Sequence, residues 1–200
     1  VFGIAYNKGS ITIERLILSG VAISSVLGSI QAVFLLRSDD ARIQNSLTWL
    51  SGTLAGRDWS DIQFTWVPIT VVTLISILLS KKLNLAVLDN DTSQSLGLSI
   101  LQLRILVGLL ATILTACAVC IAGLVGFVGL VIPHIVRLIF GYDFKLILPI
   151  SALLGSLVVL AADIIARSFL GELPVGLVTS LIGSPFFVYI LRKSRTKRFS

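Results

Sequence analysis

Residues 123–137 read Gly-Leu-Val-Gly-Phe-Val-Gly-Leu-Val-Ile-Pro-His-Ile-Val-Arg, and this stretch decides how the chain folds. It places three glycines, a proline and the only histidine of the chain in an otherwise apolar background. A segment that only anchors a protein in lipid has no need of such residues, because they let a helix bend or let two backbones approach closely. The stretch therefore indicates a working part of a membrane protein.

The composition supports a membrane protein. Hydrophobic residues make up 56% of the chain and the mean hydropathy is +1.00. Charged residues make up 13%, against about 25% in an average soluble domain. The chain has five long uncharged runs, and most have the length of one helical crossing without the polar stripe of a soluble helix. These runs are Leu16–Leu36, Ile62–Ser80, Ile105–Val136, Leu146–Ala162 and Leu173–Leu191. We expect an all-α, polytopic membrane helix bundle.

The run Ile105–Val136 would form a helix of about 48 Å, which exceeds a hydrocarbon core of about 30 Å. Two helices with a turn near Gly123–Gly129 place 12 of the 16 Lys and Arg residues on one side, whereas one long helix divides them 6 to 10. The positive-inside rule favours two helices. We therefore predict about six transmembrane helices in a single domain over residues 1–200, with both ends in the cytoplasm.

The net charge of +6 then belongs to inside loops that face anionic lipid, and no nucleic-acid partner is expected. Cys117 and Cys120 lie in the middle of an apolar run, and His134 has no second ligand at a metal-binding spacing, so no metal site is expected. The sequence has no phosphate-binding loop of the ATPase type. We predict a protein that is not an enzyme, with no catalytic residues and no bound cofactor.

Acidic groups are almost missing from the apolar runs. Asp163 is the only acid within a predicted span, and it lies near the outer end. Ion-coupled transporters usually place acidic or coordinating groups at mid-depth, where the driving ion binds. Energy for transport is therefore expected to come from another subunit.

The segment 81–104 is a long inside loop with an apolar face of its own. Asp89 or Asp91 could cap a short helix that ends at Gly97. Such a loop favours a docking surface, although a solvated connector also fits. Its apolar residues include Leu85, Leu88, Leu96 and Leu98.

Several motifs together resemble one family. They are Gly126–Arg137, the Leu-Pro-Ile-Ser-Ala-Leu-Leu-Gly and Ala-Asp-Ile-Ile-Ala-Arg elements within Leu148–Arg167, and Glu172–Phe187 with Glu-Leu-Pro-Val-Gly and Ile-Gly-Ser-Pro-Phe-Phe. Arg15–Ala22 and Trp49–Trp59 also fit. The chain resembles the permease subunits of ATP-binding-cassette importers for iron–siderophore complexes, haem and cobalamin, and the siderophore branch more than the cobalamin branch.

This resemblance implies ten spans, of which the chain would hold the last six. It also implies that the loop 81–104 carries coupling helices that sit in a cleft of the ATPase. Asp89 stands where the family commonly has glycine, and Ser93 where it has alanine. The coupling residues would be Leu85, Leu88, Asp89, Asp91, Leu96 and Gly97.

Binding-protein docking would fall on Arg167 and Glu172, although Arg167 also follows Asp163 at the spacing of an ordinary i,i+4 ion pair. The residues expected to pack or bend the helices are Gly123, Gly126, Gly129, Pro133, Pro174, Gly176, Gly183 and Pro185.

The implied partners are a second permease chain, two cytoplasmic ATPase subunits that carry ATP and Mg, an extracytoplasmic substrate-binding protein and the lipid of the bacterial inner membrane. A secondary transporter or channel without an ATPase, an importer for haem or cobalamin, and a membrane scaffold are the alternatives. The glycine and proline positions disfavour the scaffold.

Overall fold

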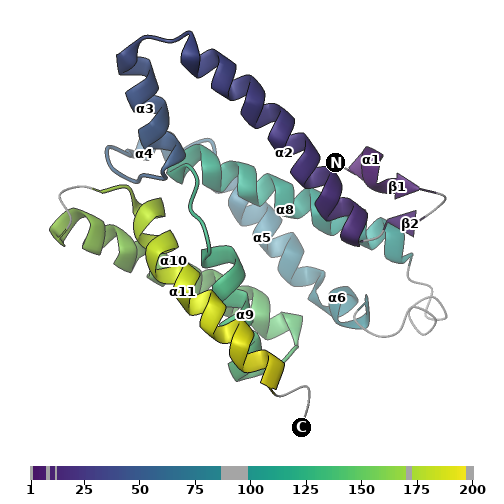
Figure 1. The fold of residues 1–200 in the computed structure, drawn as a ribbon. Helices are drawn as coiled ribbons and strands as arrows, with labels where there is room; N and C mark the ends of the chain where they lie inside the picture. The colour runs from purple at the N-terminus through teal and green to yellow at the C-terminus, as the bar shows by residue number, and fades with distance from the viewer. Residues whose placement is uncertain (1, 8–9, 12, 87–98, 170–172, 197–200) are drawn as a thin grey trace.

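The computed structural model describes residues 2–7, 10–11, 13–86, 99–169 and 173–196, and helices form almost all of this part (Figure 1). Near the N-terminus, α1 (Phe2–Ala5) precedes the two-residue strands β1 (Tyr6–Asn7) and β2 (Ser10–Ile11), which pair antiparallel. The other helices are α2 (Ile13–Leu36), α3 (Asp40–Leu50), α4 (Trp59–Ile62), α5 (Trp66–Leu78), α6 (Ser80–Ala86), α8 (Ile100–Ala122), α9 (Val128–Phe140), α10 (Phe144–Phe169) and α11 (Val175–Thr196).

The division of the long apolar run into two helices is confirmed. Helix α8 ends at Ala122 and α9 begins at Val128, and a non-helical linker joins them (Figure 1). Two residues of the linker have positive φ angles, +68° at Gly123 and +63° at Phe127. Glycine reaches this region without steric cost, whereas a bulky side chain such as phenylalanine rarely does. The glycine predicted to break the run therefore lies at the break.

The described helices confirm a multi-pass membrane protein but do not establish six crossings. Three of them are long and apolar enough to cross a bilayer: Glu14–Leu36, Ile100–Ala122 and Phe144–Ser168. Helices α5 and α6 would make a fourth if they form one span with a bend of 51°. Helix α9 has 13 residues, or about 20 Å, and is shorter than a hydrocarbon core. The number of six crossings and the cytoplasmic position of both ends stay predictions.

Helix α10 holds the bundle together. It packs against α9 and α11 on one side and against α5 and α6 on another (Figure 1). Buried side chains stabilise the contacts of α10 with the helices before and after it: Ile147 lies with Ile132 and Val136 of α9, and Ala166 lies with Val175 of α11. Helix α5 also packs along α8. Because α10 touches both groups of helices, it fixes how they lie relative to one another.

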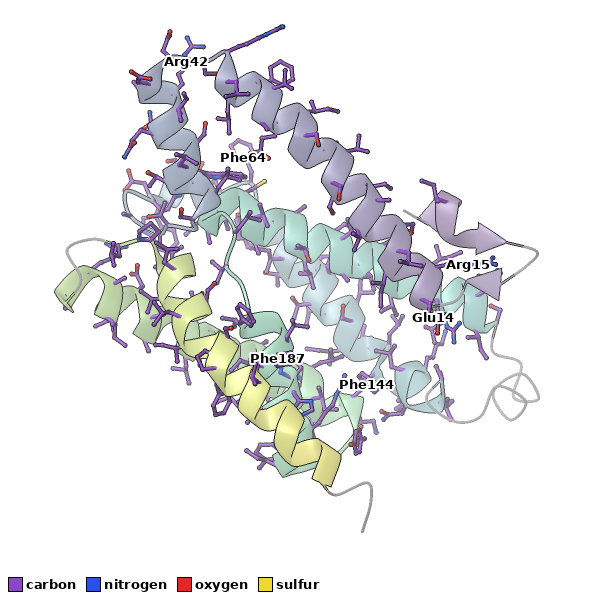
Figure 2. All side chains as sticks on the ribbon, viewed as in Figure 1. Glu14, Arg15, Arg42, Phe64, Phe144 and Phe187 are labelled. Atoms are coloured by element: carbon purple, nitrogen blue, oxygen red, sulfur yellow. The ribbon has the colours of Figure 1, made fainter. Side chains whose placement is uncertain are left out.

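Most large apolar side chains point outward. They project from α2 and α8 on several sides (Figure 2). In each of these two helices, only 6% of the most apolar 18-residue stretch is buried inside the protein. Water would penalise such a surface, but lipid tails do not. Many serine and threonine hydroxyls within the helices donate to the carbonyl one turn earlier, as Ser25 does to Val21 and Thr112 does to Gly108. This pairing satisfies the hydroxyls where lipid offers no acceptor.

The prolines and glycines predicted to bend the helices have unequal roles. Helix α9 runs on through Pro133 and α11 through Pro185, so the break lies at the linker and not at a proline. A Cβ on Gly126 would lie 3.2 Å from Ser180 Oγ, whereas one on Gly129 would meet nothing within 4 Å. Close packing thus involves Gly126. For Gly129, which precedes Pro133 by four residues, a packing role stays a prediction.

Gly183 makes room for the strained residue of the linker. A Cβ on Gly183 would lie 2.6 Å from the Cβ and 3.3 Å from the Cγ of Phe127. Atoms of this kind do not approach so closely, so α11 can pass the linker only where it has no side chain. The positive φ of Phe127 and the glycine of α11 therefore belong to one packing arrangement.

We predict that Gly183→Ala destabilises the protein by about 1–3 kcal/mol, the usual cost of inserting a methyl group into a packed site. Phe127→Gly should restore much of the loss, because it removes the opposing side chain and relieves the positive φ. Thermal unfolding of the purified protein in detergent would measure both effects. Gly155→Ala is the matched control, because its Cβ would lie at an ordinary 3.8 Å from Val128. Independent, additive losses in the double variant would contradict the proposed contact.

Candidate functional site

Three glycines from distant parts of the chain form a junction at the end of the bundle that we expect to face outward. Gly52 follows α3, Gly123 follows α8, and Gly176 lies in the first turn of α11. A Cβ on Gly52 would lie 2.5 Å from the carbonyl oxygen of Leu124. A Cβ on Gly123 would clash with the carbonyl of Trp49, and one on Gly176 with that of Ser51. We call Gly52, Gly123 and Gly176 the glycine junction.

A backbone hydrogen bond closes the glycine junction. The amide of Gly176 donates to the carbonyl of Gly52 at 3.1 Å. The first amides of a helix have no partner within the helix, and an unpaired one is costly in a membrane. Pro174, immediately before α11, has no amide hydrogen to satisfy. The junction therefore fixes the position of α11 and gives one of its first backbone amides a hydrogen-bond acceptor.

Arg167 lies close to the same loop. It belongs to the last turn of α10, and its Nε lies 2.9 Å from Oδ2 of Asp163. Its Nη2 also donates to the carbonyl of Leu54 at 3.1 Å. The expected i,i+4 ion pair is therefore present, and the guanidinium is additionally held by the loop after α3. Half of the Arg167 side chain remains exposed, so its charge is available at the surface.

An apolar cavity of about 320 Å³ lies between α9, α10 and α11. Val131, Ile135, Val158, Ile182 and Phe186 are among its lining residues. A ferric chelate is rich in oxygen atoms and charge, and an apolar wall offers it no hydrogen bonds. This cavity suits apolar contacts between helices or with lipid better than it suits such a substrate.

At the opposite end of α10, three polar groups join α6 to the turn between α9 and α10. The side-chain amide of Asn84 donates to Oδ1 of Asp143 at 2.7 Å, and the backbone amide of Phe144 donates to Oδ1 of Asn84 at 2.9 Å. The backbone amide of Lys145 also donates to Oδ1 of Asp143. The hydrogen bond from Asn84, followed by the one from Lys145, lowers the pKa of Asp143. The carboxylate is therefore ionised at neutral pH, and it caps the start of α10.

The structure tests only part of the predicted site. Leu85 lies on α6 and is partly exposed, and Arg167 lies at the far end of α10, so coupling and docking positions fall at opposite ends of that helix. Among the described residues, no three His, Cys, Asp or Glu side chains gather as a metal site. Six predicted site residues lie outside the described ranges, and they are Leu88, Asp89, Asp91, Leu96, Gly97 and Glu172.

Sequence reasoning missed the contacts that join distant segments. Gly52 and Gly56 have the small-xxx-small spacing that is typical of close helix packing, but a Cβ on Gly56 would meet nothing within 4 Å. Sequence reasoning also missed Asn84 and Asp143. One signal was available, because Asp143 follows Gly141 and precedes an apolar run, which is the pattern of a helix C-terminus followed by an N-cap.

Comparison with known proteins agrees with this architecture. The family model described as the FecCD transport family matches residues 1–193. The chain belongs to the FecCD transport family. The resemblance inferred from the sequence motifs is thus confirmed.

The names of the relatives refer to several different substrates. The cobalamin import system permease protein BtuC of Halobacterium salinarum is 38% identical, and the match covers 96% of this chain and 52% of the relative. The Fe(3+)-citrate import system permease protein YfmD of Bacillus subtilis is 37% identical, and the match covers 94% of this chain and 57% of the relative. The hemin transport system permease protein HmuU of Yersinia pestis is 35% identical, and the match covers 93% of this chain and 56% of the relative. The chain spans about half the length of the curated relatives it matches.

A solved structure has the same fold. It is described as an inward-facing conformation of an ABC transporter of the metal-chelate type, and it superposes with a TM-score of 0.86 at 34% identity. The match covers 91% of this chain and 60% of that chain. The arrangement of helices is therefore that of a family member.

We predict that Gly176→Ala lowers the yield of folded permease or its melting temperature, because the new methyl group would collide with the carbonyl of Ser51 and separate α11 from the glycine junction. The cost should be about 1–3 kcal/mol or more, since backbone atoms on both sides cannot move aside as a flexible side chain can. Gly20→Ala, on α2, is the matched control, because its Cβ would meet nothing within 4 Å. Equal stability of the two variants would show that the junction tolerates a side chain.

Proposed function

We propose that this chain is part of a permease subunit of an ATP-driven importer that moves iron–siderophore complexes across the bacterial inner membrane. The match to the FecCD transport family over residues 1–193 carries this proposal. The relatives are named as permease or transport proteins, which supports a transport subunit rather than an enzyme. ATP and Mg would bind to a separate subunit.

The choice of substrate rests on the siderophore-like motifs. The relatives named for cobalamin and ferric citrate are 38% and 37% identical, and these values are too close to separate the two substrates. Import of haem or cobalamin is therefore the second candidate. Growth of a deletion strain on single iron sources, compared with growth on cobalamin, would distinguish them.

The proposed assembly contains two permease chains, as a homo- or heterodimer, with two cytoplasmic ATPase subunits and an outer substrate-binding protein. Asp163 is the only acid within a predicted span, and it is paired with Arg167. An ion-driven transporter would need a coordinating group at mid-depth. Vesicles that contain the full-length permease and its partners should take up ferric chelate only with ATP inside, and uptake driven by an ion gradient alone would contradict the proposal.

The ATPase should dock on the coupling residues of the segment 81–104. We predict that Leu96→Asp releases the ATPase in a pull-down while the permease still inserts, because a charge replaces an apolar side chain that the partner buries. Losing such a contact costs about 1–3 kcal/mol. Ser95→Asp adds the same charge at a neighbouring polar position and should retain more ATPase. Normal co-purification and transport by Leu96→Asp would refute docking at this segment.

Arg167 is proposed as a docking charge for an acidic residue of the binding protein, where charge complementarity mainly sets encounter and register. We predict that Arg167→Glu weakens association of the binding protein and makes it less dependent on salt. Asp163→Ala separates this role from the ion pair, because it breaks the pair and leaves the positive charge in place. If Arg167 serves only the pair, worth about 0.2–1 kcal/mol, both variants should behave alike. Binding at low salt that is unchanged by Arg167→Glu would remove Arg167 from the site.

A further inference from the structure

The chain turns sharply where it leaves the bundle toward the proposed coupling segment. Helices α5 and α6 meet at an angle of 51°, and Ser80 at the bend is 3% exposed. Helix α6 then packs against α10 and ends at Ala86, where the described part stops before residue 99. Force applied to the segment between α6 and α8 can therefore reach the bundle through α6 as well as through α8.

Asn84 is the residue through which α6 forms hydrogen bonds to the turn between α9 and α10. Both ends of its side-chain amide are used, one as donor to the Asp143 carboxylate and one as acceptor from the Phe144 amide. The partners follow Asn84 by 59 and 60 residues, so these bonds join separate helices. An amide engaged at both ends cannot rotate without losing a bond, and the bond to a carboxylate is of the stronger, charge-assisted kind.

The turn that Asn84 holds is itself attached to two helices. Asp143 accepts the backbone amide of Lys145 and so caps α10. The guanidinium of Arg137, in the last turn of α9, lies 5.9 Å from the centre of the Phe144 ring, within the range of a cation–π contact. Figure 2 shows Phe144 at the end of the bundle near α6. A shift of α6 is therefore passed to α9 and α10 together.

We propose that Asn84 is a positioning residue that transmits movement of the ATPase-coupling segment to the turn between α9 and α10. This inference rests on the proposed docking of an ATPase on that segment. Helices α9 and α10 pack on one another through Ile147 and Val136, so they would move as one unit. The bonds of Asn84 are then one point at which ATP hydrolysis is coupled to movement of the transport helices.

The experiment compares Asn84→Asp, Asp143→Asn and the double exchange in the complete complex of full-length permease, ATPase and binding protein in proteoliposomes. It measures ATP hydrolysed and iron taken up, using the radiolabelled ferric citrate, hydroxamate or catecholate complex that the wild type transports. Asn84→Asp places two carboxylates together, and Asp143→Asn removes the charge. In Asn84→Asp, iron uptake per ATP should fall by about three- to tenfold, the effect of losing one hydrogen bond. Asp143→Asn keeps an oxygen that can accept from Asn84 and Lys145, so its ratio should fall less. Bound ATPase should be retained.

The double exchange should restore the ratio of uptake to hydrolysis. A carboxylate at position 84 can accept from Phe144 and from a new amide at position 143, whose oxygen still accepts from Lys145. Mere loss of stability would lower the amount of complex and leave the ratio of uptake to hydrolysis unchanged. Tyr142→Ala is the control in the same turn, because that side chain is 76% exposed. A wild-type ratio in Asn84→Asp, or no rescue in the double, would overturn the role of Asn84 alone. Uptake by the wild type without ATPase would overturn the proposed function as well.

Discussion

The close approach of three backbone segments at the glycine junction is the constraint on which the rest of the structure depends. It fixes the place where α8 ends, where the loop after α3 passes and where α11 begins. Side chains cannot produce this arrangement, because each contact brings a glycine against a backbone carbonyl. In a membrane, where apolar burial gives little drive for helices to associate, such van der Waals packing and backbone pairing carry much of the specificity.

The two ends of α10 are held by different chemistry. At one end, backbone carbonyls contact glycines, and Arg167 holds the carbonyl of Leu54. At the other end, an amide and a carboxylate join α6 to the turn before α10. Backbone packing between glycines has essentially one geometry, whereas side-chain hydrogen bonds can break and re-form. The molecule thus has one end held by backbone packing and one held by side-chain hydrogen bonds, a difference that would suit the proposed importer, whose helices would move in response to an ATPase.

The apolar runs and the break near Gly123 were predictable, because lipid demands long uncharged helices and a run of 32 residues is too long for one crossing. The family was recognisable from motifs that include Pro133 and Pro174. The contacts of the site were not predictable to the same degree. Gly52 and Gly176 lie far apart in the sequence, and nothing in the local pattern of either indicates the carbonyl it meets. The pairing of Asn84 with Asp143 is equally non-local.

The shortness of α9 has a consequence for where lipid can lie. If α9 reaches the inner surface at Phe140, its length of about 20 Å leaves roughly a third of the hydrocarbon depth to the non-helical linker before it. Backbone that is not helical is tolerated at that depth only beside protein or water. Acyl chains must therefore be kept away from residues 124–127. The chain itself supplies part of this shield, because Gly52 and Gly176 lie against the carbonyl of Leu124 and Gly183 lies against Phe127. Whatever linker backbone these contacts leave open must face another polypeptide or an aqueous passage.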